Sequence, residues 1–288
     1  MIKLLKAIFS HFLESNTFQK GAALAYYAVF SIFPIIIITT SLLGLIFGDE
    51  AVSGDIYKQL NDVLGNEAAL QIQELIKSQH KSHNGILTTL IGFATLAYSA
   101  SGMVSQIHNA FNSIWKIKEK PKNGFKKYLS KQLVSFVILI VLFFIIFLST
   151  SLNGFLGQHA SSLHIDYKLL YLYEHVVSLV FLSLVFTMMF KYLGDALMNW
   201  KIAFSGGVFT ACFFLIGKIG ISMYIGHSHI ASTFGAASAL ALLMLWVYYT
   251  SQIIFLGASF VKIIAEKLNC EIQANEHAVM IENREINI

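Results

Sequence analysis

The residues with the most chemical potential in this sequence are polar or conformationally special ones that interrupt long apolar runs. Pro34 lies inside one such run, residues 24–47, and has no N–H to donate to the carbonyl one turn earlier. A helix kinked there, with Tyr26, Tyr27 and Ser31 beside the kink, would suit a substrate path. A packing kink in an inert helix is the alternative interpretation.

Lys218 is the one Lys or Arg residue deep inside an apolar run, residues 202–225. Ionisable side chains at membrane depth are costly and commonly mark functional sites. We expect its partner to be Glu174, near the outer end of the preceding run. The pair would bind an anionic headgroup or gate the outer side. Alternatively, it is a structural ion pair, or Lys218 extends its ammonium group to the interface.

Two amides lie on the predicted cytoplasmic side of apolar runs. Asn109, beside His108, is at the end of the second run, and Gln252, beside Tyr248 and Tyr249, is in the cytoplasmic half of the sixth. They either face a cavity or form hydrogen bonds between helices, an interaction worth about 0.6–2 kcal/mol in membranes. The sequence thus yields one set of candidate path residues. They are Tyr26, Tyr27, Ser31, Pro34, Asn109, Glu174, Lys218 and Gln252.

A lysine cluster between residues 116 and 131 lies directly between two apolar runs. In that position it meets anionic lipid headgroups, at about 1 kcal/mol per charge, and RNA is the less favoured ligand. The predicted headgroup contacts are Lys116, Lys118, Lys126, Lys127 and Lys131.

Histidine pairs provide the only pattern that suggests a metal. His80 with His83, and His227 with His229, could bind a divalent ion or sense pH. Both pairs lie in predicted loops, and no cysteine or fixed carboxylate completes either set. We therefore expect no metal site and no cofactor.

Composition sets the class of protein. Hydrophobic residues make up 56% of the 288 residues and charged residues only 12%, about half the share in soluble domains. A membrane span needs about 20 mostly apolar residues, and runs of that length must be helical to satisfy their backbone in lipid. We predict an all-α polytopic membrane protein. Its six transmembrane helices are residues 24–47, 86–107, 133–156, 170–190, 202–225 and 235–261.

The basic residues set the orientation, because Lys and Arg accumulate on the cytoplasmic side of membrane proteins. Of the 20 Lys and Arg residues, fifteen fall on the side that holds both chain ends. Four fall on the other side, and Lys218 lies inside a span. We therefore predict cytoplasmic N- and C-termini and an even number of spans.

Further helical elements flank these spans. Residues 2–13 place Leu5, Ile8, Phe9 and Phe12 on one helical face, which predicts an amphipathic helix on the membrane surface. The long outer loop 48–85 has the pattern of a helical hairpin. We assign residues 1–265 to one membrane domain and residues 266–288 to a partly disordered cytoplasmic tail.

Four of the predicted spans carry motifs that resemble a known family. They are GAALAYYAVFSIFPIIIITTSLLGLIF (21–47), SGMVSQIHNAFNSIW (101–115), FLIGKIGISMY (214–224) and FGAASALALLMLWVYYTSQIIFLGASF (234–260). Together, over about residues 15–265, they closely resemble the YihY/virulence factor BrkB family, formerly labelled ribonuclease BN. One departure is Ser259, where family members commonly have an acidic residue.

The resemblance implies a bacterial inner-membrane protein in contact with membrane lipid, for which transport is the activity usually suggested. We expect translocation or export of a small solute or envelope lipid through a cavity between the helices. The alternative is an envelope assembly or interaction protein with no path of its own. Ribonuclease activity is the least favoured, because metal-dependent cleavage uses clustered carboxylates or histidines, and the predicted cytoplasmic side has only scattered acids. We therefore expect no enzyme and no nucleic-acid partner.

Overall fold

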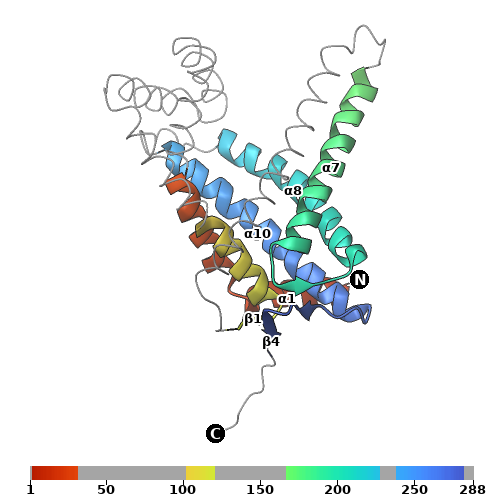
Figure 1. The fold of residues 1–288 in the computed structure, drawn as a ribbon. Helices are drawn as coiled ribbons and strands as arrows, with labels where there is room; N and C mark the ends of the chain where they lie inside the picture. The colour runs from red at the N-terminus through yellow and green to blue at the C-terminus, as the bar shows by residue number, and fades with distance from the viewer. Residues whose placement is uncertain (1, 32–101, 121–166, 228–237, 282–288) are drawn as a thin grey trace, which may run out of the picture. The chain divides into compact units, whose positions relative to one another are not determined.

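The computed structural model describes residues 2–31, 102–120, 167–227 and 238–281, which are mostly helical (Figure 1). Residues 17–31 and 102–114 are helical in addition to the labelled elements. In chain order these elements are α1 (Ile2–Glu14), β1 (Ile117–Glu119), α7 (Tyr167–Tyr192), β2 (Ala196–Leu197), α8 (Trp200–His227), α10 (Ser238–Lys267), β3 (Gln273–Ala274) and β4 (Ala278–Met280).

Three of the described helices are long and apolar enough to cross a membrane. They are His175–Tyr192 in α7, Trp200–Gly220 in α8 and Leu240–Lys267 in α10. These agree with the fourth, fifth and sixth predicted spans. The predicted third span and the outer hairpin at 48–85 lie outside the described residues, as do Pro34 and most of the first two spans. The total of six spans therefore stays a prediction.

The chain divides into two compact units. The first contains Met1–Phe18, Ile107–Lys218 and Gln252–Ile288, and the second contains Gln19–Gln106 and Ile219–Ser251. In the second unit, Gly102 leaves room for the ring of Tyr27, which a Cβ at that position would strike. Ser31 is buried there, and its hydroxyl donates to the carbonyls of Tyr27 and Ala28 in its own helix.

Close approach of α7, α8 and α10 builds the core of the first unit. A Cβ on Gly207 of α8 would lie 2.5 Å from the carbonyl oxygen of Ser183 in α7. Gly257 of α10 lies equally close to α8, because a Cβ there would strike the side chain of Thr210. Phe209 and Phe260 stack with their ring centroids 4.1 Å apart. Small residues permit this spacing between membrane helices, so this region is a dense core.

Buried hydroxyl groups within these helices satisfy their own backbone. Each donates to a carbonyl four residues earlier, at 2.6–3.0 Å. The donors are Ser183, Thr187, Thr210 and Ser259. Because each hydroxyl donates inside its own helix, none of these donors needs a partner on a neighbouring helix.

The amphipathic helix predicted for residues 2–13 is present as α1, and its apolar side chains divide between two faces. Ile8 and Phe12 are buried, at 2% and 5% exposure. Leu5, Phe9 and Leu13 are exposed. The helix is therefore docked through one apolar face and presents a second apolar face outward.

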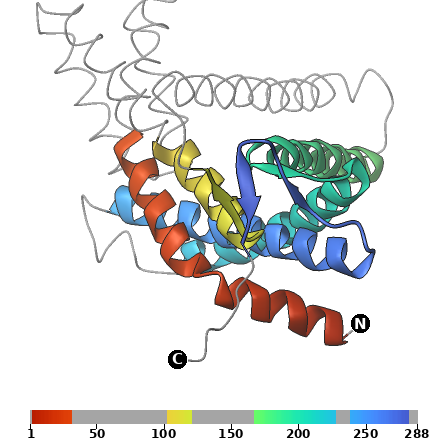
Figure 2. The ribbon, with the colours of Figure 1, turned by 60° about the horizontal axis from the view of Figure 1, so that its bottom comes forward.

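The C-terminal residues fold back on the first unit in two short antiparallel strand pairs (Figures 1 and 2). β1 pairs with β4, and β2 pairs with β3. The chain reverses after α10 because Asn269 adopts a left-handed conformation (φ 52°), and the N–H of Cys270 then bonds to the carbonyl of Ala265 at 2.9 Å. β3 and β4 lie in the segment that the sequence assigns to a tail, and the domain boundary near residue 265 stays a prediction.

Candidate functional site

Asp195 is the centre of a buried hydrogen-bond network in the connection between α7 and α8. Asn112, from helix 102–114, contacts it twice. The Nδ2 of Asn112 donates to Asp195 Oδ2 at 2.8 Å, and its Oδ1 accepts from the Asp195 backbone N–H at 2.9 Å. His108, one turn earlier on the same helix, places Nε2 at 3.1 Å from the same carboxylate oxygen.

The proton position on His108 follows from its neighbours. The Nδ2 group of Asn112 lies 3.3 Å from His108 Nδ1. An amide N–H needs an acceptor there, so Nδ1 is unprotonated and the ring proton lies on Nε2, facing Asp195. The second hydrogen of Asn112 Nδ2 remains for the carboxylate, and each amide hydrogen has its own acceptor.

The C-terminal segment supplies the remaining donors to Asp195. Asn275 Nδ2 donates to Asp195 Oδ1 at 3.0 Å, and the Asn275 backbone N–H donates to the Asp195 carbonyl at 2.9 Å. A buried carboxylate is costly unless donors surround it. Side chains from helix 102–114 and from the C-terminal segment meet that need. Asp195 therefore joins three segments that are distant in sequence.

Trp115 anchors the same helix end to the core. Its side chain is fully buried, and its indole N–H donates to the carbonyl of Ala258 in α10 at 3.1 Å. Gly194, next to Asp195, makes room for this ring, since a Cβ there would lie 2.5 Å from it. The network thus rests on a rigid support.

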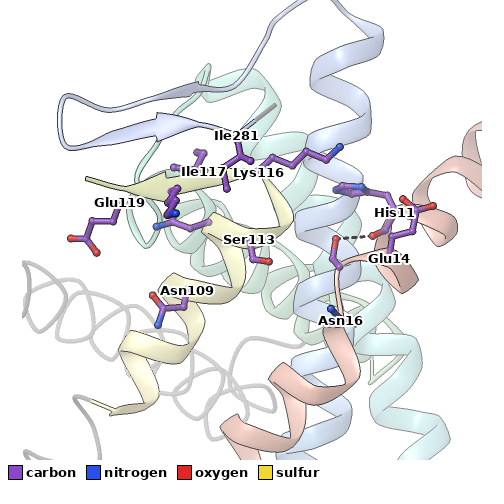
Figure 3. A pocket seen from close by; sticks show the side chains of 12 residues that line it. His11, Glu14, Asn16, Asn109, Ser113, Lys116, Ile117, Glu119 and Ile281 are labelled. Atoms are coloured by element: carbon purple, nitrogen blue, oxygen red, sulfur yellow. Dashed lines mark hydrogen bonds between the residues drawn. The ribbon is translucent and has the colours of Figure 1, made fainter. Parts of the chain in front are cut away.

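A groove of about 460 Å³ adjoins the network, because Asn112 belongs to both. One wall is α1 with the turn that follows it, and the other is the end of helix 102–114 with β1 (Figure 3). Residues that line it include His11, Asn16, Asn109, Ser113, Lys116 and Ile281.

Two residues with left-handed backbone conformations and two hydrogen bonds fix the walls of the groove. Asn16 (φ 51°) ends α1, and Lys116 (φ 55°) ends helix 102–114. The Nε2 of His11 donates to the carbonyl of Ile114 at 2.8 Å, which holds α1 against the end of the neighbouring helix. The N–H of Ile281 donates to the carbonyl of Lys116 at 2.8 Å and holds the C-terminal segment beside them.

Two lysines and two glutamates line the groove, and they differ in how available they are to a ligand. Lys116 extends toward His11, whereas Glu119 points away from the centre (Figure 3). Among the residues that the structure describes, the ammonium groups of Lys116 and Lys118 have no hydrogen bond or ion pair. Glu14 already accepts a hydrogen bond from the Ser10 hydroxyl at 2.8 Å. The two lysines are therefore the charges most accessible to a ligand.

Comparison with known proteins places the chain in a family. The family model described as virulence factor BrkB matches residues 8–282. The chain belongs to the virulence factor BrkB family. This confirms the resemblance found in the motifs of four spans, and this BrkB-family chain is an integral membrane protein.

Curated relatives of this BrkB-family chain carry the name UPF0761 membrane protein. The relative from Teredinibacter turnerae is 27% identical over 272 residues, which cover 92% of this chain and 61% of the relative. The relative from Psychrobacter sp. is 26% identical over 257 residues, 88% of this chain and 46% of the relative. The relative from Pseudomonas aeruginosa is 25% identical over 267 residues, which cover 90% of this chain and 62% of the relative. The chain therefore spans about half to three fifths of these relatives, and no solved structure matches it.

The first unit of this BrkB-family chain holds three of the predicted path residues as described side chains. Asn109 lines the groove. Gln252 Nε2 donates to the carbonyl of Thr17 at 3.4 Å, which ties α10 to the start of helix 17–31. Lys218 is exposed on α8. The side chain of Glu174 lies outside the described residues, so the pairing of Lys218 with Glu174 stays a prediction.

The other predicted site residues fall elsewhere. Tyr26, Tyr27 and Ser31 belong to the second unit, where Tyr26 is exposed and packs on Phe30 with ring centroids 4.7 Å apart. Of the predicted headgroup lysines, Lys116 and Lys118 line the groove. Pro34, Lys126, Lys127 and Lys131 lie outside the described residues.

The sequence did not identify the centre of the network. Asn112 is four residues after His108, so both lie on one helical face, and this spacing is the signal that could have linked them. Asp195 is the one acid in the connection between α7 and α8. Its partner Asn275 comes from the predicted tail, where no periodicity points to it. Among the described residues, no three His, Cys, Asp or Glu side chains form a group that could hold a metal.

Proposed function

We propose that this protein translocates or exports a small solute or an envelope lipid across the bacterial inner membrane, with both termini in the cytoplasm. The observation that carries the proposal is the polar groove beside the Asp195 network. Its volume of about 460 Å³ falls within the usual range for small-molecule sites. We assign the groove as the substrate-binding site at the cytoplasmic end of the path. The proposal includes no catalytic step.

The rigid surroundings of the groove support this assignment. A substrate-binding site needs side chains that are held in place before the ligand arrives, because ordering them on binding costs affinity. The His11 contact to Ile114 and the twofold contact of Asn112 with Asp195 supply that order. The indole N–H of Trp115, which donates to Ala258 in α10, ties the end of helix 102–114 to the core.

Flux assays in proteoliposomes test the proposal. One arm measures efflux of entrapped radiolabelled glycerol 3-phosphate, and the other measures dithionite access to fluorescently labelled phospholipid. We expect protein-dependent flux in at least one arm. Asn109→Trp fills the groove from an exposed position and should reduce that flux about tenfold or more, since the site would no longer admit substrate.

A matched control separates plugging from general damage. Gln273→Trp adds the same bulk at an exposed position of β3 outside the groove, and flux should stay within about twofold of the parent. Absence of flux in both arms, from protein that remains folded, contradicts the transport proposal. Equal loss in both variants contradicts the assignment of the groove.

A second candidate, an envelope assembly or interaction protein, is favoured by apolar side chains on the strand pairs. Leu197, Val279 and Met280 are exposed there, at 41–55%. Exposed apolar patches commonly mark contacts with another protein. Constant co-purification of one protein, lost on Val279→Ser with Met280→Ser and accompanied by no flux, would favour this function over transport.

A further inference from the structure

We infer that the groove takes a small water-soluble organic anion, a phosphate ester or carboxylate, rather than the headgroup of a lipid in the bilayer. The inference rests on the proposed function, because it names the substrate class that the substrate-binding site would bind. It stands on two observations, the charge of the groove and the orientation of α1.

The charge favours an anion. Lys116 and Lys118 present ammonium groups that no described residue neutralises. The amides of Asn16 and Asn109 and the hydroxyl of Ser113 line the same groove without partners among the described residues. Phosphate and carboxylate oxygens accept from such donors, and charge-assisted hydrogen bonds are the stronger kind. An ammonium ligand would instead face two cations at this position.

Two carboxylates also line the groove, and both are less available to a ligand than the two ammonium groups. The Glu14 carboxylate accepts from Ser10 one turn earlier on α1. Glu119 points away from the groove centre (Figure 3). A ligand anion beside Lys116 therefore meets donors on the side of helix 102–114 and one partly engaged carboxylate on the side of α1.

The faces of α1 indicate the side from which the ligand arrives. Leu5, Phe9 and Leu13 form one exposed apolar face, at 44–56% exposure. At 3.6 residues per turn, His11 and Glu14 lie roughly 140–160° around the helix from Phe9. An apolar face of this kind belongs at the boundary of headgroups and acyl chains. The opposite face, which lines the groove, then points to water, so the ligand enters from the aqueous side.

A phosphate group could come from a lipid or from a soluble ester, and a binding experiment separates these sources. The full chain is placed in nanodiscs of phosphatidylcholine alone and titrated with glycerol 3-phosphate by calorimetry. We expect saturable binding that weakens as salt is raised. In a second preparation, phosphatidylglycerol is added to the discs. We expect it not to compete with glycerol 3-phosphate.

Three variants assign the binding to the groove. Lys116→Asn removes the charge, and asparagine tolerates the left-handed backbone conformation at this position. This variant should weaken the binding of glycerol 3-phosphate about tenfold. Glu14→Gln removes the nearby carboxylate and should tighten binding about twofold. Lys201→Gln, an exposed lysine on α8 outside the groove, is the charge-matched control and should leave binding unchanged.

Distinct results overturn the inference and the transport function. Equal binding by Lys116→Asn and the parent overturns the anion site. Weaker binding by Glu14→Gln also overturns it, because an anion seated beside Lys116 and Glu14 would be repelled by this carboxylate and could not lose affinity when its charge is removed. Displacement of glycerol 3-phosphate by phosphatidylglycerol shows a lipid site and also overturns the inference. Binding is measured in nanodiscs and flux in proteoliposomes, so the two results are independent. Anion binding in nanodiscs without flux in proteoliposomes contradicts the transport function alone. Flux without anion binding contradicts this inference alone.

Discussion

Asn112 and Asp195 are joined by two hydrogen bonds, side chain to side chain at 2.8 Å and side chain to backbone at 2.9 Å. Asn112 also lines the groove, so one residue links the binding surface to the buried carboxylate. The same carboxylate binds His108 and Asn275. Loss of Asp195 would therefore leave polar groups from two other segments buried without their acceptor.

The first prediction concerns this carboxylate. Asp195→Ala should lower the free energy of unfolding by about 2–4 kcal/mol, because the donor groups of Asn112, His108 and Asn275 lose their acceptor. Asp195→Asn should cost less, since it keeps one acceptor oxygen. Denaturant unfolding of the detergent-solubilised protein measures both. Glu271→Ala, at an exposed position, is the control and should change the free energy by less than about 0.5 kcal/mol. An Asp195→Ala variant as stable as that control would refute the structural role.

The second prediction compares two glycines on α8. Gly207→Ala would place a Cβ against Thr187 and 2.5 Å from the carbonyl of Ser183, so α7 and α8 must separate. We expect a loss of about 1–3 kcal/mol. Gly220→Ala has nothing within 4 Å of the added Cβ and should be neutral or gain up to about 1 kcal/mol of helix propensity. Thermal unfolding in one detergent ranks the two variants, and equal midpoints would contradict the close packing.

The third prediction uses two phenylalanines on α1. Phe12 is 5% exposed and Phe9 is 56% exposed. Phe12→Ala should destabilise the first unit by about 3–5 kcal/mol, because it leaves a cavity under the helix. Phe9→Ala should cost under about 1 kcal/mol in detergent, since its face is not packed on the protein core. Hydrogen exchange of α1 reports both changes. A larger effect from Phe9 would show that α1 docks through the opposite face.

Long apolar runs made most of the described fold predictable. The runs at 170–190, 202–225 and 235–261 contain enough apolar residues to indicate α7, α8 and α10, and the spacing of Ile8 and Phe12 indicated α1. Periodicity could not separate the docked face of α1 from its outward face, because both are apolar. That distinction depends on the end of helix 102–114, which His11 contacts.

The network and the groove were less accessible to sequence reasoning. His108 and Asn109 were recognised as polar residues at a span end, but their roles differ because adjacent residues point about 100° apart on a helix. His108 turns to the buried carboxylate, and Asn109 turns to the groove. Asp195 and Asn275 are 80 residues apart and meet only because β2 pairs with β3. No local pattern encodes that pairing.

The last prediction tests the orientation that the lysine distribution favours. The two cysteines are Cys212, partly exposed in α8, and Cys270, exposed just after α10. With Cys212→Ser as background, a membrane-impermeant maleimide should label Cys270 in inverted inner-membrane vesicles and leave it unlabelled in intact spheroplasts. Cys270→Ser in the same background should abolish the signal in the inverted vesicles. Fifteen basic residues on one side make this the expected direction, because that side stays in the cytoplasm during insertion. Labelling of Cys270 in spheroplasts would place the groove outside the cytoplasm and would reverse the direction from which its ligand arrives.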